Sequence, residues 1–253
     1  ATLYQYYNSA NSNSYGLITG SSQIEDYAFT IEANFIFPKK PDINSLDYYA
    51  IPTVLSSLFG FHTPIDESPT STTMTWAGSS NDYGLQVYAK RVAEGFQDSD
   101  TIGTSKNVRF LVVDRSGDTI CTSDLCENVY DNTKWNLALS IRPHGYPFAK
   151  EFDSYTVELY GSQYDLGIKK KSFETQGTLA YDTGRATLAS AKRIYAGAHR
   201  TNFTGGLLTG TDIRLGGVRY WQTYLPKDTV DHHSRCVESF GPQHPARNEY
   251  LFP

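Results

Sequence analysis

Large apolar residues recur at every second position in several stretches of the chain, and this period predicts β-strands with one buried face. The clearest stretch is residues 135–141, where the odd-numbered positions from Trp135 to Ile141 are all large and apolar. Residues 29–37 show the same period before Pro38 and Pro41 end the strand. Further strands are predicted over residues 85–88, 108–113, 155–160, 194–198 and 213–220. In the last of these the apolar phase slips by one residue at Gly216-Gly217, which predicts a β-bulge there.

Turn-forming residues separate these stretches and complete the prediction of an all-β domain. They occur at Ser116-Gly117-Asp118, Pro143-His144-Gly145, Asp182-Thr183-Gly184 and Gly205-Gly206. Only residues 227–237, which follow Pro226, predict a helix. Short strands with frequent turns and no strand–helix alternation favour a sandwich or barrel.

Composition and charge narrow the functional classes. The chain of 253 residues has 22 basic and 27 acidic side chains and a net charge of −5, with no sustained basic run, so nucleic acid is not an expected partner. No apolar stretch approaches the roughly 20 residues that span a bilayer. Because the chain starts without Met and lacks a signal-peptide pattern, we interpret it as a processed product or a segment of a longer polypeptide.

Four segments together resemble the concanavalin A-like lectin/glucanase superfamily, in its laminin G-like branch. Residues 27–35 resemble the early strand of that family, and residues 134–140 resemble its central strand, which begins with Trp. Residues 196–205 and 212–227 resemble the closing segment, where a glycine turn leads into a strand and then a short helix. The resemblance implies a jelly roll of two packed antiparallel sheets over residues 26–240, with an arm or linker at 1–25 and a tail or linker at 241–253.

The same resemblance implies a domain that binds carbohydrate or protein. The tail from Phe240 to Phe252 looks like the sequel to such modules in large phage structural proteins. We therefore expect a non-catalytic binding or structural module of a larger extracellular or virion assembly, with glycans or other structural subunits as partners. The alternatives are a free-standing, calcium-assisted lectin and a glycoside hydrolase.

Hydrolysis is disfavoured because the paired carboxylates of the glucanase branch are incomplete. The hydrolase motif of the family is Glu-x-Asp-x-x-Glu, and the nearest match is Glu151-Phe152-Asp153, with Thr156 where the second Glu should stand. A retaining glycosidase needs two carboxyl groups about 5 Å apart. We therefore expect no enzymatic activity.

Two kinds of metal site are candidates. Cys121 and Cys126, with His232 and Cys236 at helical i, i+4 spacing, have the donor types of a tetrahedral zinc site, if the helix packs over the cysteine loop. A local disulfide and buried thiols are the alternatives. Calcium, common in the superfamily, has loop aspartates as candidate ligands: Asp98, Asp100, Asp114, Asp118, Asp124 and Asp131. The alternative, which the sequence favours because no fixed ligand spacing stands out, is a set of ordinary solvated turn aspartates.

Aromatic residues outside the predicted core are the remaining candidates for binding. Tyr88, Tyr160 and Trp221 fall opposite the apolar face of their strands, while Tyr146, Tyr164 and Phe148 lie in loops. Such rings stack on sugars or anchor protein interfaces, but a sandwich also carries aromatics on outer faces that neighbouring segments cover. The run Lys169-Lys170-Lys171 is interpreted as a sheet edge kept charged against strand pairing.

Overall fold

The computed structural model describes residues 5–6, 28–39, 54–62, 83–92, 105–146, 153–189, 192–200, 207–221 and 223–235. Its elements, in chain order, are β1 (Gln5–Tyr6), β2 (Phe29–Phe37), β3 (Leu55–His62), β4 (Gly84–Arg91), β5 (Val108–Asp114), β6 (Thr119–Thr122), β7 (Thr133–Pro143), β8 (Ser154–Asp165), β9 (Ile168–Ala180), α3 (Tyr181–Ala189), β10 (Lys192–Ala196), β11 (His199–Arg200), β12 (Leu207–Thr209), β13 (Arg214–Trp221) and α4 (Lys227–Arg235). No helix among these ranges is both long and apolar enough to cross a membrane.

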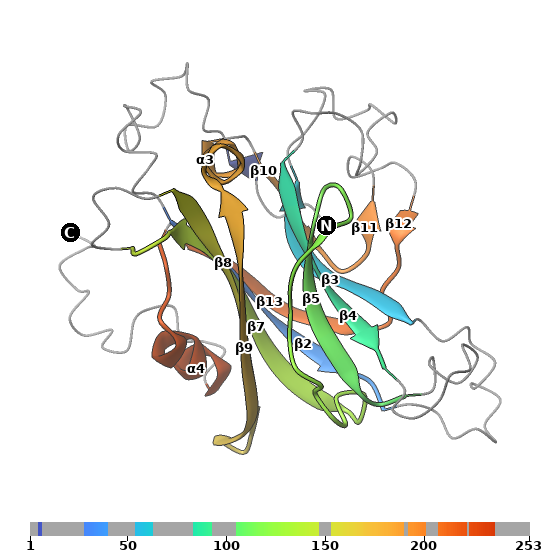
Figure 1. The fold of residues 1–253 in the computed structure, drawn as a ribbon. Coiled ribbons are helices and arrows are strands. Elements are labelled where there is room, and N and C mark those ends of the chain that lie inside the picture. Colours follow the sequence, from blue (N-terminus) through green and yellow to red (C-terminus); the bar gives the residue numbers. More distant parts are fainter. Residues whose placement is uncertain are drawn as a thin grey trace.

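Two antiparallel sheets face each other and form a jelly-roll sandwich (Figure 1). One sheet has the strand order β1-β10-β3-β4-β5-β6, and the other has the order β13-β2-β7-β8-β9. The chain crosses between these two sheets after β1, β2, β6 and β9, and it returns from β10 to β13 by way of a separate two-stranded sheet, β11-β12, so neighbours within a sheet are often distant in sequence. The predicted all-β, two-sheet architecture is therefore confirmed.

The hydrophobic core lies between the two sheets and is built from the alternating positions that the sequence indicates. Trp135, Leu137, Leu139 and Ile141 are each at most 1% exposed and face this core. Aromatic rings cluster within it, and Phe110 stacks on Phe173 with ring centroids 4.9 Å apart and planes inclined by 8°. The predicted inward faces of β2 and β7 are thus correct.

The predicted bulge in the last strand is also present. β13 pairs with β2, and its register shifts between Leu215 and Val218, the two residues that flank Gly216-Gly217. The shift lets Val218 and Tyr220 pack against the core. Trp221 consequently lies on the outer face of the five-stranded sheet, paired in register with Thr30.

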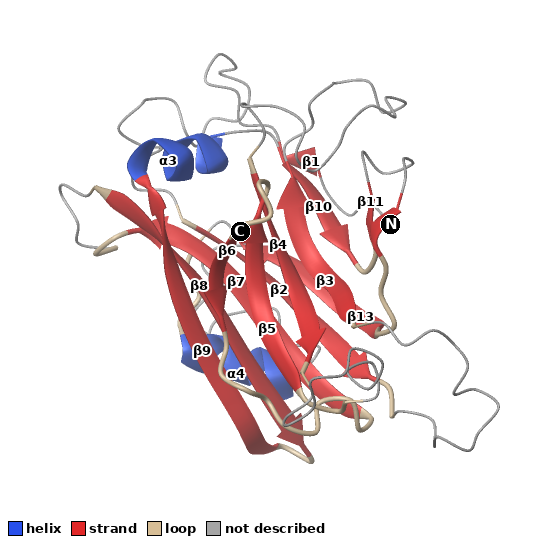
Figure 2. Ribbon diagram, turned by 45° about the vertical axis from the view of Figure 1, so that its right-hand side comes forward, coloured by secondary structure: helices blue, strands red, loops and turns tan. Residues whose placement is uncertain are grey.

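The prediction of a turn at Asp182-Thr183-Gly184 is wrong, because these residues lie in α3, at one end of the sandwich (Figure 2). Gly184 is needed there for close packing. A Cβ at this position would lie 2.2 Å from Cδ2 of Tyr155 in β8. The residue that looks like a turn signal is in fact a contact point between the helix and the sheet.

The second helix, α4, lies on the outer side of the five-stranded sheet and covers part of that face (Figure 1). It starts at Lys227, as predicted, and its assigned end is Arg235. Val230 of α4 packs against Ala138 and Tyr160 of the sheet. β7 is therefore buried on both faces, although its sequence alternates like that of a half-exposed strand.

Candidate binding site at the sandwich edge

The outer face of the five-stranded sheet is polar, and the chain's own C-terminal segment covers its centre. Glu32, on β2, is 1% exposed and accepts hydrogen bonds from Arg219 Nη1 at 3.0 Å and Trp221 Nε1 at 3.2 Å. Nδ1 of His233, on α4, lies 2.8 Å from the same carboxylate oxygen. Burial alone would raise the pKa of Glu32, but His233 and Arg219 outweigh it and hold that pKa below its ordinary value.

A second buried carboxylate lies further along the same face. Glu158, on β8, accepts hydrogen bonds from Arg142 Nη2 at 2.7 Å, Gln176 Nε2 at 3.0 Å and the Tyr224 hydroxyl at 3.2 Å. The guanidinium carbon of Arg142 also lies 4.0 Å from the centroid of the Tyr224 ring. Both buried carboxylates of this face are thus neutralised by arginine and covered by residues of the C-terminal segment.

The aromatic residues predicted to bind a ligand take part in internal contacts. Trp221, predicted to lie opposite the apolar face, does so, but its ring stacks on His233 with centroids 5.3 Å apart and planes inclined by 15°. Its indole N–H is used by Glu32. The structure therefore places Trp221 beneath α4, so that its contacts are those of a packed outer-face residue.

Tyr160 and Tyr88 likewise lie on outer faces and are 5% and 6% exposed. The Tyr160 hydroxyl donates to Asp231 of α4 at 2.8 Å and accepts from Lys169 at 2.7 Å. Burial raises the pKa of Tyr160 to about 12, with Lys169 opposing and Asp231 adding to the effect. The hydroxyl of Tyr88 lies 3.4 Å from Nδ1 of His199, and burial raises the pKa of Tyr88.

Tyr146 and Tyr164 are both half-buried. Tyr146 lies in the turn after β7, as predicted, whereas the prediction of a loop at Tyr164 is wrong, because this residue lies in β8. The ring of Tyr146 makes an edge contact with Tyr224, with centroids 6.4 Å apart. The ring of Tyr164 lies under Arg235, whose guanidinium carbon is 5.1 Å from its centroid. Phe148 lies outside the described residues. The five candidate rings do not converge on one site.

The candidate zinc ligands do not come together within the described residues. Cys121 and Cys126 are free thiols in the core between the sheets. His232 is on α4, which packs on the outer face of the five-stranded sheet, so a sheet separates it from both thiols. Cys236 lies outside the described residues, and within them no group of three His, Cys, Asp or Glu side chains is placed to hold a metal ion. The helix does not pack over the cysteine loop as the zinc hypothesis requires.

Both core thiols are expected to react slowly with alkylating reagents in the folded protein. Burial raises the pKa of Cys121 and of Cys126 to about 11, so little thiolate is present at pH 8. Peptide mass mapping after brief iodoacetamide treatment should find residues 121 and 126 unmodified, and modified after denaturation. Rapid native labelling at either position would show that these thiols are not part of the core.

The candidate calcium ligands serve other roles where the structure describes them. Asp114 accepts hydrogen bonds from the backbone N–H groups of Ser116 and Asp118 and so closes the predicted turn. Asp131 forms an ion pair with Lys106 at 3.1 Å. Asp124 lines the cleft described next. Asp98 and Asp100 lie outside the described residues, as do Glu151 and Phe152 of the incomplete hydrolase motif.

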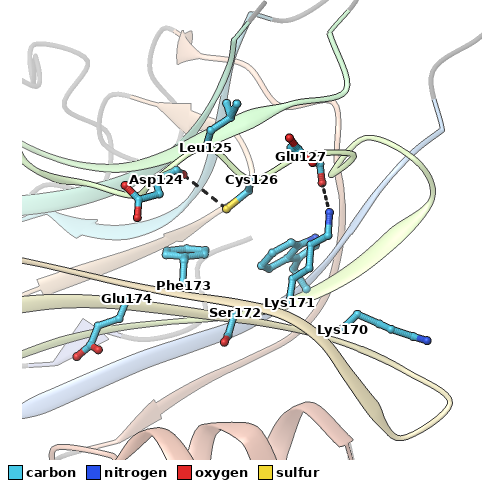
Figure 3. Close-up of a pocket in the computed structure, with 10 residues that line it drawn as sticks. Asp124, Leu125, Cys126, Glu127, Lys170, Lys171, Ser172, Phe173 and Glu174 are labelled. Atoms are coloured by element: carbon cyan, nitrogen blue, oxygen red, sulfur yellow. Dashed lines mark hydrogen bonds between the residues drawn. The ribbon is translucent and has the colours of Figure 1, made fainter. Parts of the chain in front are cut away.

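A cleft of about 640 Å³ opens at the edge of the sandwich, where the two sheets separate (Figure 3). One wall is the segment 124–127 that follows β6, and the other is the first half of β9, from Lys170 to Glu174. Just beyond the cleft along β9, the two edge strands are in contact, since the Thr175 hydroxyl of β9 donates to the carbonyl of Thr122 of β6 at 2.9 Å. The cleft begins where the chain leaves β6.

The cleft has an apolar floor and a rim of both charges. Its full lining is Asp124, Leu125, Cys126, Glu127, Trp135, Lys170, Lys171, Ser172, Phe173 and Glu174. Lys171 reaches across the opening and donates to the carbonyl of Glu127 at 2.6 Å, and Glu174 pairs with Lys227 of α4. A volume of a few hundred Å³ is typical of ligand sites, but the surface of this cleft is more polar than apolar.

Sequence reasoning did not find this cleft. Lys170 and Lys171 are noticed only as a charge run, and their predicted place on a sheet edge is correct, since β9 is the last strand of its sheet. Segment 124–127 is more than 40 positions away in the chain. Its loop character, with two acids beside an apolar pair, is the one local signal that points to it.

Comparisons with known proteins give no family. No family model matches the chain, and no curated protein does. Among solved structures, the chain is similar to the marine PL-14 alginate lyase from Aplysia kurodai, with a TM-score of 0.30 and 6% sequence identity over 67% of this chain and 69% of that one. A likeness at this level shows neither a family nor an activity for this chain.

Proposed function

We propose that this sandwich is a non-catalytic binding and structural module of a larger extracellular or virion assembly, and that it contacts a protein or carbohydrate partner at the edge cleft. The observation that carries the proposal is the contrast between two surfaces. The centre of the outer sheet face is covered by the chain's own segment 223–235, whereas the edge cleft stays open, with a volume of about 640 Å³.

The electrostatics of the buried carboxylates support binding over acid–base catalysis. A catalytic general acid needs a pKa raised toward the working pH. The pKa of Glu32 is instead lowered by His233 and Arg219. Glu158 pairs with Arg142 at 2.7 Å and accepts a hydrogen bond from Tyr224. The lowered pKa favours an ionised Glu32, and the contacts of both carboxylates hold the C-terminal segment in place.

The cleft offers two kinds of contact to a partner. Phe173 presents partly buried apolar surface at its floor, beside Cys126 and Trp135. Lys170 and Glu127 are exposed at its rim, where they are available to polar groups of either sign. An apolar anchor with a polar surround is the usual arrangement of a protein interface, and an aromatic floor also suits the face of a sugar ring.

Reversing the charge of the cleft tests this proposal. Probes selected with the wild-type protein, from a random-peptide display library and a glycan array, should bind the double variant Lys170→Glu/Lys171→Glu at least about tenfold more weakly. Lys90→Glu, at an exposed lysine on β4 of the other sheet, is the matched control and should bind as the wild type does. Failure to select any peptide or glycan, or equal binding by all three proteins, would contradict the proposal.

A further inference from the structure

The β8–β9 turn carries two strongly exposed apolar side chains. Leu166 is 95% exposed and Ile168 is 61% exposed, whereas the other exposed large apolar residues of the described ranges lie between 36% and 55%. Both belong to the tip of a hairpin at the far end of the five-stranded sheet (Figure 2). Contiguous exposed apolar side chains at a projecting tip are typical of interaction sites.

The backbone conformation at this tip is unfavourable for the leucine found there, Leu166. Asp165 pairs with Ile168, so Leu166 and Gly167 form a two-residue turn, and their φ angles are +49° and +78°. Two positive φ angles define a type I′ turn, for which Asn-Gly is strongly preferred. A leucine in this left-handed region is strained because its side chain crowds the backbone. An apolar side chain kept at a strained, solvated position indicates that the side chain itself makes a contact.

The tip lies directly beside the edge cleft. Lys170 and Lys171, which line the cleft, follow Ile168 by two and three residues on β9 (Figure 3). β9 is also the edge strand of its sheet, and edge strands have backbone groups free to meet another chain. A projecting apolar tip and a receiving cleft with an apolar floor therefore share one edge of the molecule.

We propose that the partner at this edge is a second copy of this chain, bound so that the Leu166–Ile168 tip of each copy sits in the edge cleft of the other. This rests on the proposed function, because it names the occupant of the same cleft. A two-fold axis satisfies both contacts at once, since a two-fold interface brings the same patch of each copy together. A benzene-sized group fits a cavity of about 150 Å³, so a cleft of about 640 Å³ has room for both side chains.

The charges around the tip favour this partner. The rim combines Lys170 and Lys171 with Asp124, Glu127 and Glu174, so two facing copies can pair opposite charges. An anionic lipid surface is disfavoured, because those carboxylates offset the lysines. Asp165 adds a further negative charge at the base of the tip, and Lys169 already pairs with Asp231 at 2.8 Å.

Sedimentation equilibrium of the chain tests the inference. The wild type should show a concentration-dependent dimer at concentrations up to about 100 μM, and Leu166→Asn/Ile168→Thr should dimerise at least about tenfold more weakly. Leu166→Asn alone places a preferred residue in the turn, so it should keep or raise the melting temperature while weakening the dimer. Leu207→Asn, at another exposed leucine on β12, should leave the dimer unchanged.

Several results would overturn the inference. These are a wild type that is monomeric throughout, tip variants that dimerise as the wild type does, or Leu207→Asn being the variant that loses the dimer. Co-sedimentation of the wild type, but not the tip variant, with phosphatidylcholine/phosphatidylserine vesicles would assign the tip to a lipid surface instead. If the wild type is monomeric but its selected probes bind Lys170→Glu/Lys171→Glu more weakly, the proposal of a second copy is wrong and the proposed function still stands. If the lysine variant binds the selected probes as tightly as the wild type does, the proposed function itself is contradicted.

Discussion

Leu139→Ala is expected to lower the free energy of unfolding by about 2–5 kcal/mol, as for other fully buried leucines. Leu139 is 0% exposed and lies in the middle of β7, between Ile31 of β2 and Leu159 of β8 in the sheet register. Truncation removes apolar contacts and leaves a cavity that close-packed neighbours on both strands can fill only in part. Denaturant melts monitored by tryptophan fluorescence measure the loss.

Leu215→Ala is the matched control, because Leu215 is 40% exposed on β13. Its cost should stay within about 0.5 kcal/mol, the range of surface sites. A loss of that size at Leu139 as well would mean that the assigned inward face of β7 is wrong.

Glu32→Ala should cost about 3–5 kcal/mol, because it leaves the largely buried guanidinium of Arg219 without its charged partner and the buried ring of His233 without its polar contact. Nη1 of Arg219 and Nδ1 of His233 both lie within 3.0 Å of Oε1 of Glu32, and the side chains of Arg219 and His233 are 9% and 0% exposed. Since His233 belongs to α4, amide hydrogen exchange over residues 227–235 should rise in the variant. Glu127→Ala removes an exposed carboxylate. It should change the free energy of unfolding by no more than about 0.5 kcal/mol and leave the amide exchange of residues 227–235 as in the wild type.

The pH dependence of this contact follows from the lowered pKa of Glu32. A carboxylate with a folded pKa below its unfolded value contributes stability that is complete above the unfolded value, here 4.5, and is lost as the pH falls through the folded pKa. The difference in unfolding free energy between the wild type and Glu32→Gln should therefore narrow below pH 4.5. A difference that is constant from pH 7 down to acid unfolding would contradict an ionised Glu32.

The fold could be predicted where a strand has one clearly apolar face. Residues 135–141 and the bulge at Gly216-Gly217 are such cases, because the core takes every second side chain and a slip in phase must be absorbed by the backbone. Of the edge strand β9, only the charged run at residues 169–171 was predicted. The inward positions of β9 include Thr175 and Gly177, so the apolar alternation is interrupted where β6 packs closely against it.

The outer faces could not be predicted from periodicity. The alternation in β7 indicates which side chains face the core, but it does not show that α4 covers the other side. Trp221 and Tyr160 were therefore correctly placed opposite the apolar face, while the helix that packs on them became visible only in the structure. The cleft depends on segments 124–127 and 170–174 meeting across two sheets, which no local pattern records.

The edge cleft as the binding site is the central claim, and amide hydrogen exchange with and without a selected peptide or glycan probe tests it most directly. Binding at the cleft predicts slower exchange in segments 124–127 and 168–174, with little change elsewhere. Slower exchange confined to residues 223–235 on the outer sheet face, or to β11 and β12, with segments 124–127 and 168–174 unchanged, would contradict it.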